Sequence, residues 1–144
     1  MVTVDASVWV AIDADDEEAA GECRDFLASV LARRQEVHQP TLTVVEVCAA
    51  VARRTGDEAL SREAGARLLR FPSLTVHPLD LEASGLAAAL AAEARLRGAD
   101  AVYAATARRH GTVLVTLDRE LLERSSQQVT TATPAEWLQG GAGA

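Results

Sequence analysis

The stretch Arg97–Asp118, RGADAVYAATARRHGTVLVTLD, predicts a helix followed by a strand. Asp100 stands near the start of the helix, and Gly111 marks the turn that ends it. The segment Val113–Val115 is β-branched and apolar, which indicates a short buried strand. Two carboxylates, Asp100 and Asp118, therefore bracket one helix–strand unit. Other carboxylates in the chain decide whether these two belong to a larger site.

Length and composition predict a single packed domain. The chain has 144 residues, of which 49% are hydrophobic and only 3% aromatic, so its core must consist mainly of Ala, Leu and Val. We expect the domain to cover residues 1–138 and residues 139–144, rich in Gly and Ala, to form a flexible tail.

The charge balance limits the classes of partner. The formal net charge is −7, and the sequence contains no Lys. An acidic surface argues against broad electrostatic adhesion to nucleic acid. It remains compatible with an enzyme acting on nucleic acid whose acidic pocket is neutralised by bound cations.

Cysteine and histidine offer no obvious metal motif. Cys23 and Cys48 lack the C-x-x-C spacing of zinc sites, so we expect two buried, reduced thiols. His38, His77 and His110 are scattered without ligand spacing, and we interpret them as structural. No signal peptide or membrane-spanning run is visible, which predicts a cytoplasmic protein with no membrane segment.

Alternating short strands and helices predict a three-layer α/β/α sandwich around a mostly parallel five-stranded sheet. Strands are expected at residues 2–4, 36–39 (halted by Pro40), 74–77, 113–115 and 128–131. Besides the helix of the opening stretch, helices are expected at residues 6–12, 13–34, 43–54, 57–70, 80–97 (closed by Gly98), 119–124 and 134–138. The face of the second helix that should be buried contains Cys23, Phe26, Leu27, Val30 and Leu31.

This topology brings four carboxylates to one edge of the sheet. Asp5 and Asp118 directly follow strands, whereas Glu46 and Asp100 lie in the first turns of helices that begin at the same edge. Ligand sites in parallel α/β folds lie at the carboxyl ends of the strands. We therefore expect Asp5, Glu46, Asp100 and Asp118 to converge.

Helix capping is the alternative explanation for each carboxylate taken alone. Asp5 and Asp118 could be N-caps, Thr43 and Glu46 fit a capping box, and Asp100 favours a helix N-terminus. Four caps at one edge would crowd like charges, however, and crowding raises pKa values and costs stability. A divalent cation removes that conflict.

An all-carboxylate site with open positions suits Mg²⁺ or Mn²⁺. The chemistry this permits is hydrolysis of a phosphodiester by a metal-activated water. No Ser/His/Asp or Cys/His arrangement offers a competing nucleophile site.

Four segments together resemble the PIN-domain nucleases: VDASVWV around Asp5, TLTVVEVCAAVARR around Glu46, RGADAVYAATARR around Asp100 and LVTLDREL around Asp118. The chain length and the third segment are similar to the VapC-type toxins of type II toxin–antitoxin pairs. The resemblance implies a PIN-like fold and an Mg²⁺- or Mn²⁺-dependent endoribonuclease that cleaves RNA. It further implies a homodimer that is inhibited by a small cognate antitoxin.

The resemblance also implies roles for individual residues. Asp5, Glu46, Asp100 and Asp118 would be the catalytic, metal-binding set, and Ser7 and Thr116 match the hydroxyl positions that support it. The family more often has Thr or Ser directly after the first Asp, where this chain has Ala6, so one supporting contact could differ.

Arg97, Arg108 and Arg109 could contact RNA phosphates, although arginines near helix ends commonly serve the helix dipole or the solvent. Tyr103, three residues after Asp100, is expected in the core.

Three alternatives differ in class. An aspartyl-phosphate enzyme would share the strand-end Asp, but such enzymes use a Lys near the phosphate and this chain has none. A PIN-like binding module would capture RNA or a protein without cutting, and would gain nothing from four crowded carboxylates. A nuclease outside a toxin–antitoxin system is the third alternative.

Overall fold

The computed structural model describes residues 1–140, and its five strands form one parallel sheet in the order β3-β2-β1-β4-β5. The strands are β1 (Val2–Val4), β2 (Val37–Pro40), β3 (Leu74–His77), β4 (Val113–Val115) and β5 (Thr131–Ala132). The eight helices of the described chain are α1 (Ala6–Ala11), α2 (Glu17–Ala32), α3 (Leu42–Thr55), α4 (Glu58–Leu69), α5 (Leu81–Ala94), α6 (Gly98–His110), α7 (Arg119–Ser125) and α8 (Pro134–Gln139).

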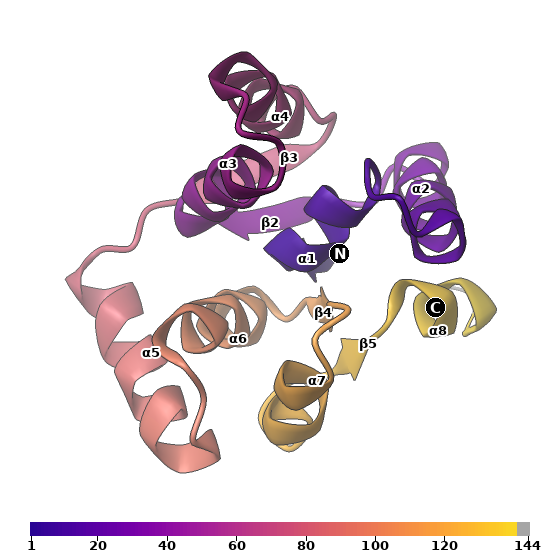
Figure 1. Cartoon of the computed structure of the whole chain (residues 1–144). Coiled ribbons are helices and arrows are strands. Elements are labelled where there is room, and N and C mark those ends of the chain that lie inside the picture. Colours follow the sequence, from indigo (N-terminus) through magenta and orange to yellow (C-terminus); the bar gives the residue numbers. More distant parts are fainter. Residues whose placement is uncertain (141–144) are drawn as a thin grey trace.

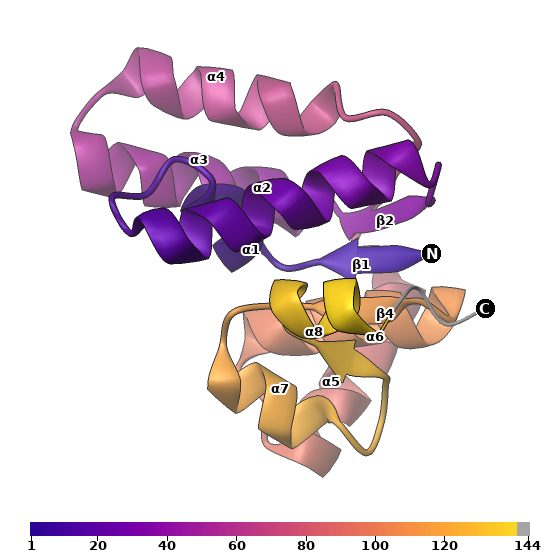
Figure 2. The same ribbon diagram turned by 90° about the vertical axis from the view of Figure 1, so that its right-hand side faces the viewer.

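Helices cover both faces of this sheet. In Figure 1, α5 and α6 lie on one side of the strands and α2 and α8 on the other. Figure 2 shows α3 and α4 side by side as an antiparallel pair. The predicted α/β/α sandwich with a parallel five-stranded sheet is therefore confirmed.

The central strands are mostly apolar and buried because both faces of the sheet are covered. Val2 and Val4 of β1 and Leu114 and Val115 of β4 are completely buried, and Val2 pairs with Val113 across the two strands. This short, rigid centre fixes where β1 and β4 end, and so fixes the backbone that carries Asp5.

Helix α6 packs against β1, β2 and β4. Every residue from Asp100 to Ala107 is buried, and four of these eight residues are Ala. Small side chains allow the helix to lie close to the sheet, which holds Asp100 at a fixed height above the strand ends.

Several strand and helix boundaries differ from the sequence prediction. The helix expected from residue 13, for example, begins at Glu17, after its N-cap Asp16. Pro40 is the last residue of β2 rather than the residue that halts it, and it pairs with His77. Pro40 has no N–H to donate, but the pairing with β3 continues past it. The next amide, that of Thr41, donates to the His77 carbonyl at 2.9 Å.

The helix predicted to run to residue 97 and to be closed by Gly98 ends at Ala94. Arg95 takes up the left-handed conformation with φ of 53°, and its amide donates to the Ala91 carbonyl. Gly98 instead begins α6. A non-glycine C-cap gives no sequence signal, and for this reason the boundary was misplaced.

Three smaller predictions were also wrong. The last strand covers only Thr131–Ala132, because the residues before it form a turn. Leu31 is 48% exposed, although the other four residues of the predicted face of α2 are buried. Both cysteines are free, but only Cys23 is buried; Cys48 is half-buried.

Gln139, the first residue of the tail predicted at residues 139–144, is the last residue of α8. Residues 141–144 lie outside the described part of the chain, so the boundary of the domain at residue 138 stays a prediction. None of the helices in residues 1–140 combines the length and the apolar character that crossing a bilayer requires.

Candidate active site

Asp5 is buried at the end of β1 and caps α1. Its Oδ2 accepts hydrogen bonds from the Ser7 hydroxyl at 2.5 Å, the Thr116 hydroxyl at 2.8 Å and the Ser7 amide at 3.3 Å. All three bonds use the same oxygen, so they fix the orientation of the carboxylate and leave Oδ1 out of this set. Asp5 can therefore cap α1 through Oδ2 and still offer Oδ1 to a ligand.

The hydroxyls of Ser7 and Thr116 also tie the end of β4 to α1. The Ser7 hydroxyl accepts from the Leu117 amide at 3.1 Å, and the Thr116 hydroxyl accepts from the Asp118 amide at 3.0 Å. The two positions expected to support the carboxylates are thus in contact with Asp5 and with the backbone leading to Asp118.

Glu46 lies one turn into α3, and the predicted capping box around it is wrong. The N-cap is Thr41, which makes no side-chain capping bond, and the Thr43 hydroxyl donates to Gln39 at 3.0 Å. Glu46 instead accepts a hydrogen bond at 2.6 Å from the hydroxyl of the buried Tyr103 in α6. A tertiary contact, not a local cap, positions this carboxylate.

Arg97 joins the other two carboxylates. Its Nε donates to Asp100 Oδ2 at 2.7 Å, and its Nη2 donates to Asp118 Oδ2. Asp118 also caps α7, because its Oδ1 accepts from two backbone amides of the first turn at 2.8 and 3.2 Å. The Arg97 side chain is 59% exposed, so it lies at the mouth of the site rather than within it.

The four carboxylates, here called the carboxylate cluster, lie close enough for their charges to act on one another. Burial raises the pKa of Glu46, and the charges of Asp5 and Asp100 raise it further, whereas the Tyr103 hydroxyl opposes the rise. Burial likewise raises the pKa of Asp100, with Asp118 and Asp5 adding to the effect against the opposing Arg97. Two members of the cluster therefore carry an ionisation cost that a cation would remove.

Asp118 behaves differently within the same cluster. Burial disfavours its charged form, but hydrogen bonds from the Leu121 amide and Arg97 outweigh burial and lower the pKa of Asp118. Asp118 is therefore more readily ionised than Glu46 and Asp100, and its charge is already balanced by a guanidinium.

The donor set fits a hard divalent cation. Oxygen ligands only, at the carboxyl edge of the sheet, suit Mg²⁺ or Mn²⁺, which keep several waters and need only one or two protein carboxylates. The oxygens of the carboxylate cluster are widely spaced, because no three of them lie within 4.8 Å of one another. Among residues 1–140, only three histidines place possible ligand atoms that close together. Waters would complete the coordination of any ion bound by the carboxylates.

The three arginines considered for RNA contact fall into two places. Arg97 lies at the carboxylate cluster, whereas Arg108 and Arg109 lie at the opposite end of α6. These two form ion pairs with Glu93 at 3.9 Å and Glu82 at 3.1 Å. The structure therefore brings only Arg97 to the carboxylates.

Sequence reasoning missed two features. Tyr103 was assigned to the core alone, although the spacing Asp100-x-x-Tyr103 places both side chains on one face of a helix. The three histidines, taken as scattered, gather into one group. Their separations of 39 and 33 residues give no sequence signal.

Comparisons with known proteins bear on the family and the fold of the chain. A sequence profile of the PIN domain matches residues 2–126. No curated protein matches the chain in sequence.

Solved structures share the fold over almost the whole chain. The crystal structure of FitAcB from Neisseria gonorrhoeae aligns with a TM-score of 0.72 and 20% identity, covering 94% of this chain and 99% of the other. VapC20 from Mycobacterium tuberculosis, described as a sarcin-ricin loop cleaving toxin, gives 0.72 and 18%, covering 88% and 95%. VapBC2 from Rickettsia felis, bound to a DNA fragment from its promoter, gives 0.71 and 14%, covering 92% and 98%.

Proposed function

The chain belongs to the PIN-domain family, and from this membership we propose that it is a divalent-metal-dependent endoribonuclease. The observation that carries the proposal is the carboxylate cluster, which collects Asp5, Glu46, Asp100 and Asp118 from four separate elements at one sheet edge. Crowded carboxylates repel one another, and a bound cation removes that repulsion. Such groups are typical of functional sites.

The residues of the cluster would have distinct tasks. Asp5, held by Ser7 and Thr116, and Glu46, held by Tyr103, present fixed oxygens to an Mg²⁺ or Mn²⁺ ion. A bound ion of this kind lowers the pKa of a coordinated water and neutralises charge on the scissile phosphate.

Arg97 would act at the mouth of the site. Its guanidinium neutralises Asp100 and Asp118 and is exposed enough to exchange a carboxylate for an RNA phosphate oxygen. Since the chain carries a net charge of −7 and no Lys, this exchange would supply positive charge where RNA approaches. Arg108 and Arg109 have no comparable position, and we assign them no contact with RNA at this site.

We further propose that the protein is the toxin of a type II toxin–antitoxin pair and works as a homodimer with a cognate antitoxin. The support is the fold shared with toxins of this type, including one described as cleaving the sarcin-ricin loop. Induced expression should arrest growth, and co-expression of the small protein encoded beside it should relieve the arrest. Growth unaffected by the active enzyme would instead favour a nuclease outside such a pair.

Cleavage of RNA by the purified protein tests the enzymatic proposal. Activity should be abolished by EDTA, restored by Mn²⁺ or Mg²⁺, and lost in Asp5→Asn and Asp100→Asn. Glu58→Gln, which changes an exposed glutamate of α4, is the matched control and should cleave normally. Cleavage undiminished by EDTA would exclude the metal-dependent mechanism, and RNA binding without any cleavage would favour a binding module.

A further inference from the structure

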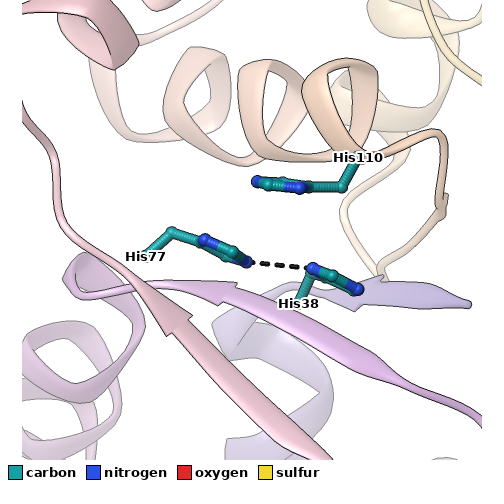
Figure 3. A group of neighbouring side chains, drawn as sticks. All are labelled: His38, His77 and His110. Atoms are coloured by element: carbon teal, nitrogen blue, oxygen red, sulfur yellow. Dashed lines mark hydrogen bonds between the residues drawn. The ribbon is translucent and has the colours of Figure 1, made fainter.

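The three histidines of the chain form one group, here called the histidine cluster, made of His38, His77 and His110. They come from β2, β3 and the last residue of α6, and all three are half-buried. Figure 3 shows the His110 ring above the pair formed by His38 and His77. His38 Nδ1 and His77 Nε2 share a hydrogen bond of 2.9 Å, and one nitrogen from each ring lies within 4.8 Å of the other two.

We propose that the histidine cluster is a second metal site, which binds Zn²⁺ through three imidazole nitrogens. Imidazole is a preferred ligand of Zn²⁺ and of neighbouring transition metals, whereas Mg²⁺ selects oxygen. The two sites of the chain would therefore hold different ions. Along α6, His110 is ten residues from Asp100, or about 15 Å by the helical rise, so the two sites do not share ligands.

The surroundings of His77 and His110 favour the neutral imidazole that a metal ligand needs. Burial lowers the pKa of His77 and of His110, and the charges of neighbouring histidines and of Arg109 lower both further. A neutral ring keeps one nitrogen lone pair free for a cation. The charge of Arg109 is partly offset by its ion pair with Glu82 at 3.1 Å.

An acidic partner orients one of the three rings. His38 Nε2 lies 3.4 Å from Glu36 Oε2, which leaves Nδ1 as the nitrogen directed at His77. Metal-binding histidines typically donate their second ring N–H to a carboxylate in this way, because the contact fixes the tautomer and increases ligand basicity. Ring stacking alone does not require this contact between His38 and Glu36.

Binding requires only local adjustment. Nitrogens of a tetrahedral zinc site are separated by about 3.3 Å, so the contact between His38 and His77 would widen by roughly 0.4 Å. The ion would take the place of their hydrogen bond, and the shared proton would shift from Nε2 to Nδ1 of His77, which keeps that ring neutral. The His110 ring, now stacked on His77 with centroids 3.9 Å apart, would turn its nitrogen toward the ion. A pocket of about 140 Å³ lined by His77, Asp80 and His110 adjoins the cluster and offers an approach for the ion and a water.

An ion in this place would join the end of β3 and the body of β2 to the C-terminus of α6. The three histidines are more than thirty residues apart in sequence, so the ion would act as a crosslink that stabilises the native state.

Cobalt absorption spectroscopy on the full chain, purified without a histidine tag, tests the proposal. Co²⁺ is titrated in millimolar Mg²⁺, which occupies the carboxylate cluster. We expect one equivalent to bind with the strong visible bands of four-coordinate cobalt, and Zn²⁺ to displace it. His77→Gln and His110→Gln should each abolish these bands. Glu36→Gln should weaken binding by about 10- to 100-fold.

The matched control is Asp100→Asn, which should keep the cobalt bands because the carboxylate cluster is a separate site. Far-ultraviolet circular dichroism shows whether the histidine variants are folded, and His38→Gln replaces any variant that is not. Absence of the bands in the wild-type protein, or bands unchanged in folded His77→Gln, would overturn the proposal. Neither result depends on ribonuclease activity, so a failure here leaves the proposed function untouched.

Discussion

Replacing Tyr103 with Phe removes one oxygen atom from the centre of the proposed site and leaves the buried ring in place. The lost contact is the 2.6 Å hydrogen bond from the Tyr103 hydroxyl to Glu46 Oε2. A hydrogen bond to a charged group contributes about 1.5–3 kcal/mol, because its removal leaves the charge partly unsolvated. For a chain of this length the loss corresponds to a decrease in Tm of about 5–10 °C.

Urea unfolding in EDTA measures this loss, and a double-mutant cycle with Glu46→Gln assigns it to the pair. In the Glu46→Gln background the acceptor is neutral, so Tyr103→Phe should cost only about 0.5–1.5 kcal/mol. The wild-type hydrogen bond lowers the pKa of Glu46, so Tyr103→Phe should also weaken Mn²⁺ binding below neutral pH. Equal costs in the two backgrounds would refute a specific role of the hydroxyl in holding Glu46.

Three further predictions concern charge and packing. Burial raises the pKa of Glu46 and Asp100, so the native state keeps protons that the unfolded chain releases. The free energy of unfolding in EDTA, measured by urea titration, should therefore fall as pH rises above about 4. Saturating Mg²⁺ should reverse this trend. Arg97→Gln should tighten Mg²⁺ binding about tenfold by calorimetry, since the ion no longer competes with a guanidinium; weaker binding would contradict this. Gly65→Ala should lower stability by about 1–3 kcal/mol because its methyl would lie 2.6 Å from a sulfur of α3. Gly85→Ala, in open space within α5, should instead raise stability by about 0.5–1 kcal/mol, and equal effects would refute the packing argument.

The parts of the fold that follow from local sequence were predictable. The β-branched segments at residues 2–4 and 113–115 are strands because short apolar runs of this kind suit a sheet covered on both faces. Asp5 and Asp118 directly follow those strands, so their place at the sheet edge follows from topology alone. The C-cap at Gly111, with φ of 62°, is likewise a local signal.

Contacts between distant elements were not predictable from the same patterns. The bond between Glu46 and Tyr103 joins residues 57 apart, and a local capping box offered an equally good explanation of the glutamate. The histidine cluster depends on β2 lying beside β3 and on α6 ending above both, which only the strand order reveals. At Arg95, a charged residue took the left-handed position expected of a glycine.

Binding of Mn²⁺ to the carboxylate cluster is the measurement that tests the central claim most directly. Calorimetric titration is best done in the His77→Gln background, which removes the histidine cluster as a competing site. We predict that this variant binds Mn²⁺ in the micromolar to millimolar range, and that adding Asp100→Asn abolishes the binding. No heat of binding at millimolar Mn²⁺, or binding that persists unchanged without the carboxylate of Asp100, would contradict the assignment of the carboxylate cluster as a cation site.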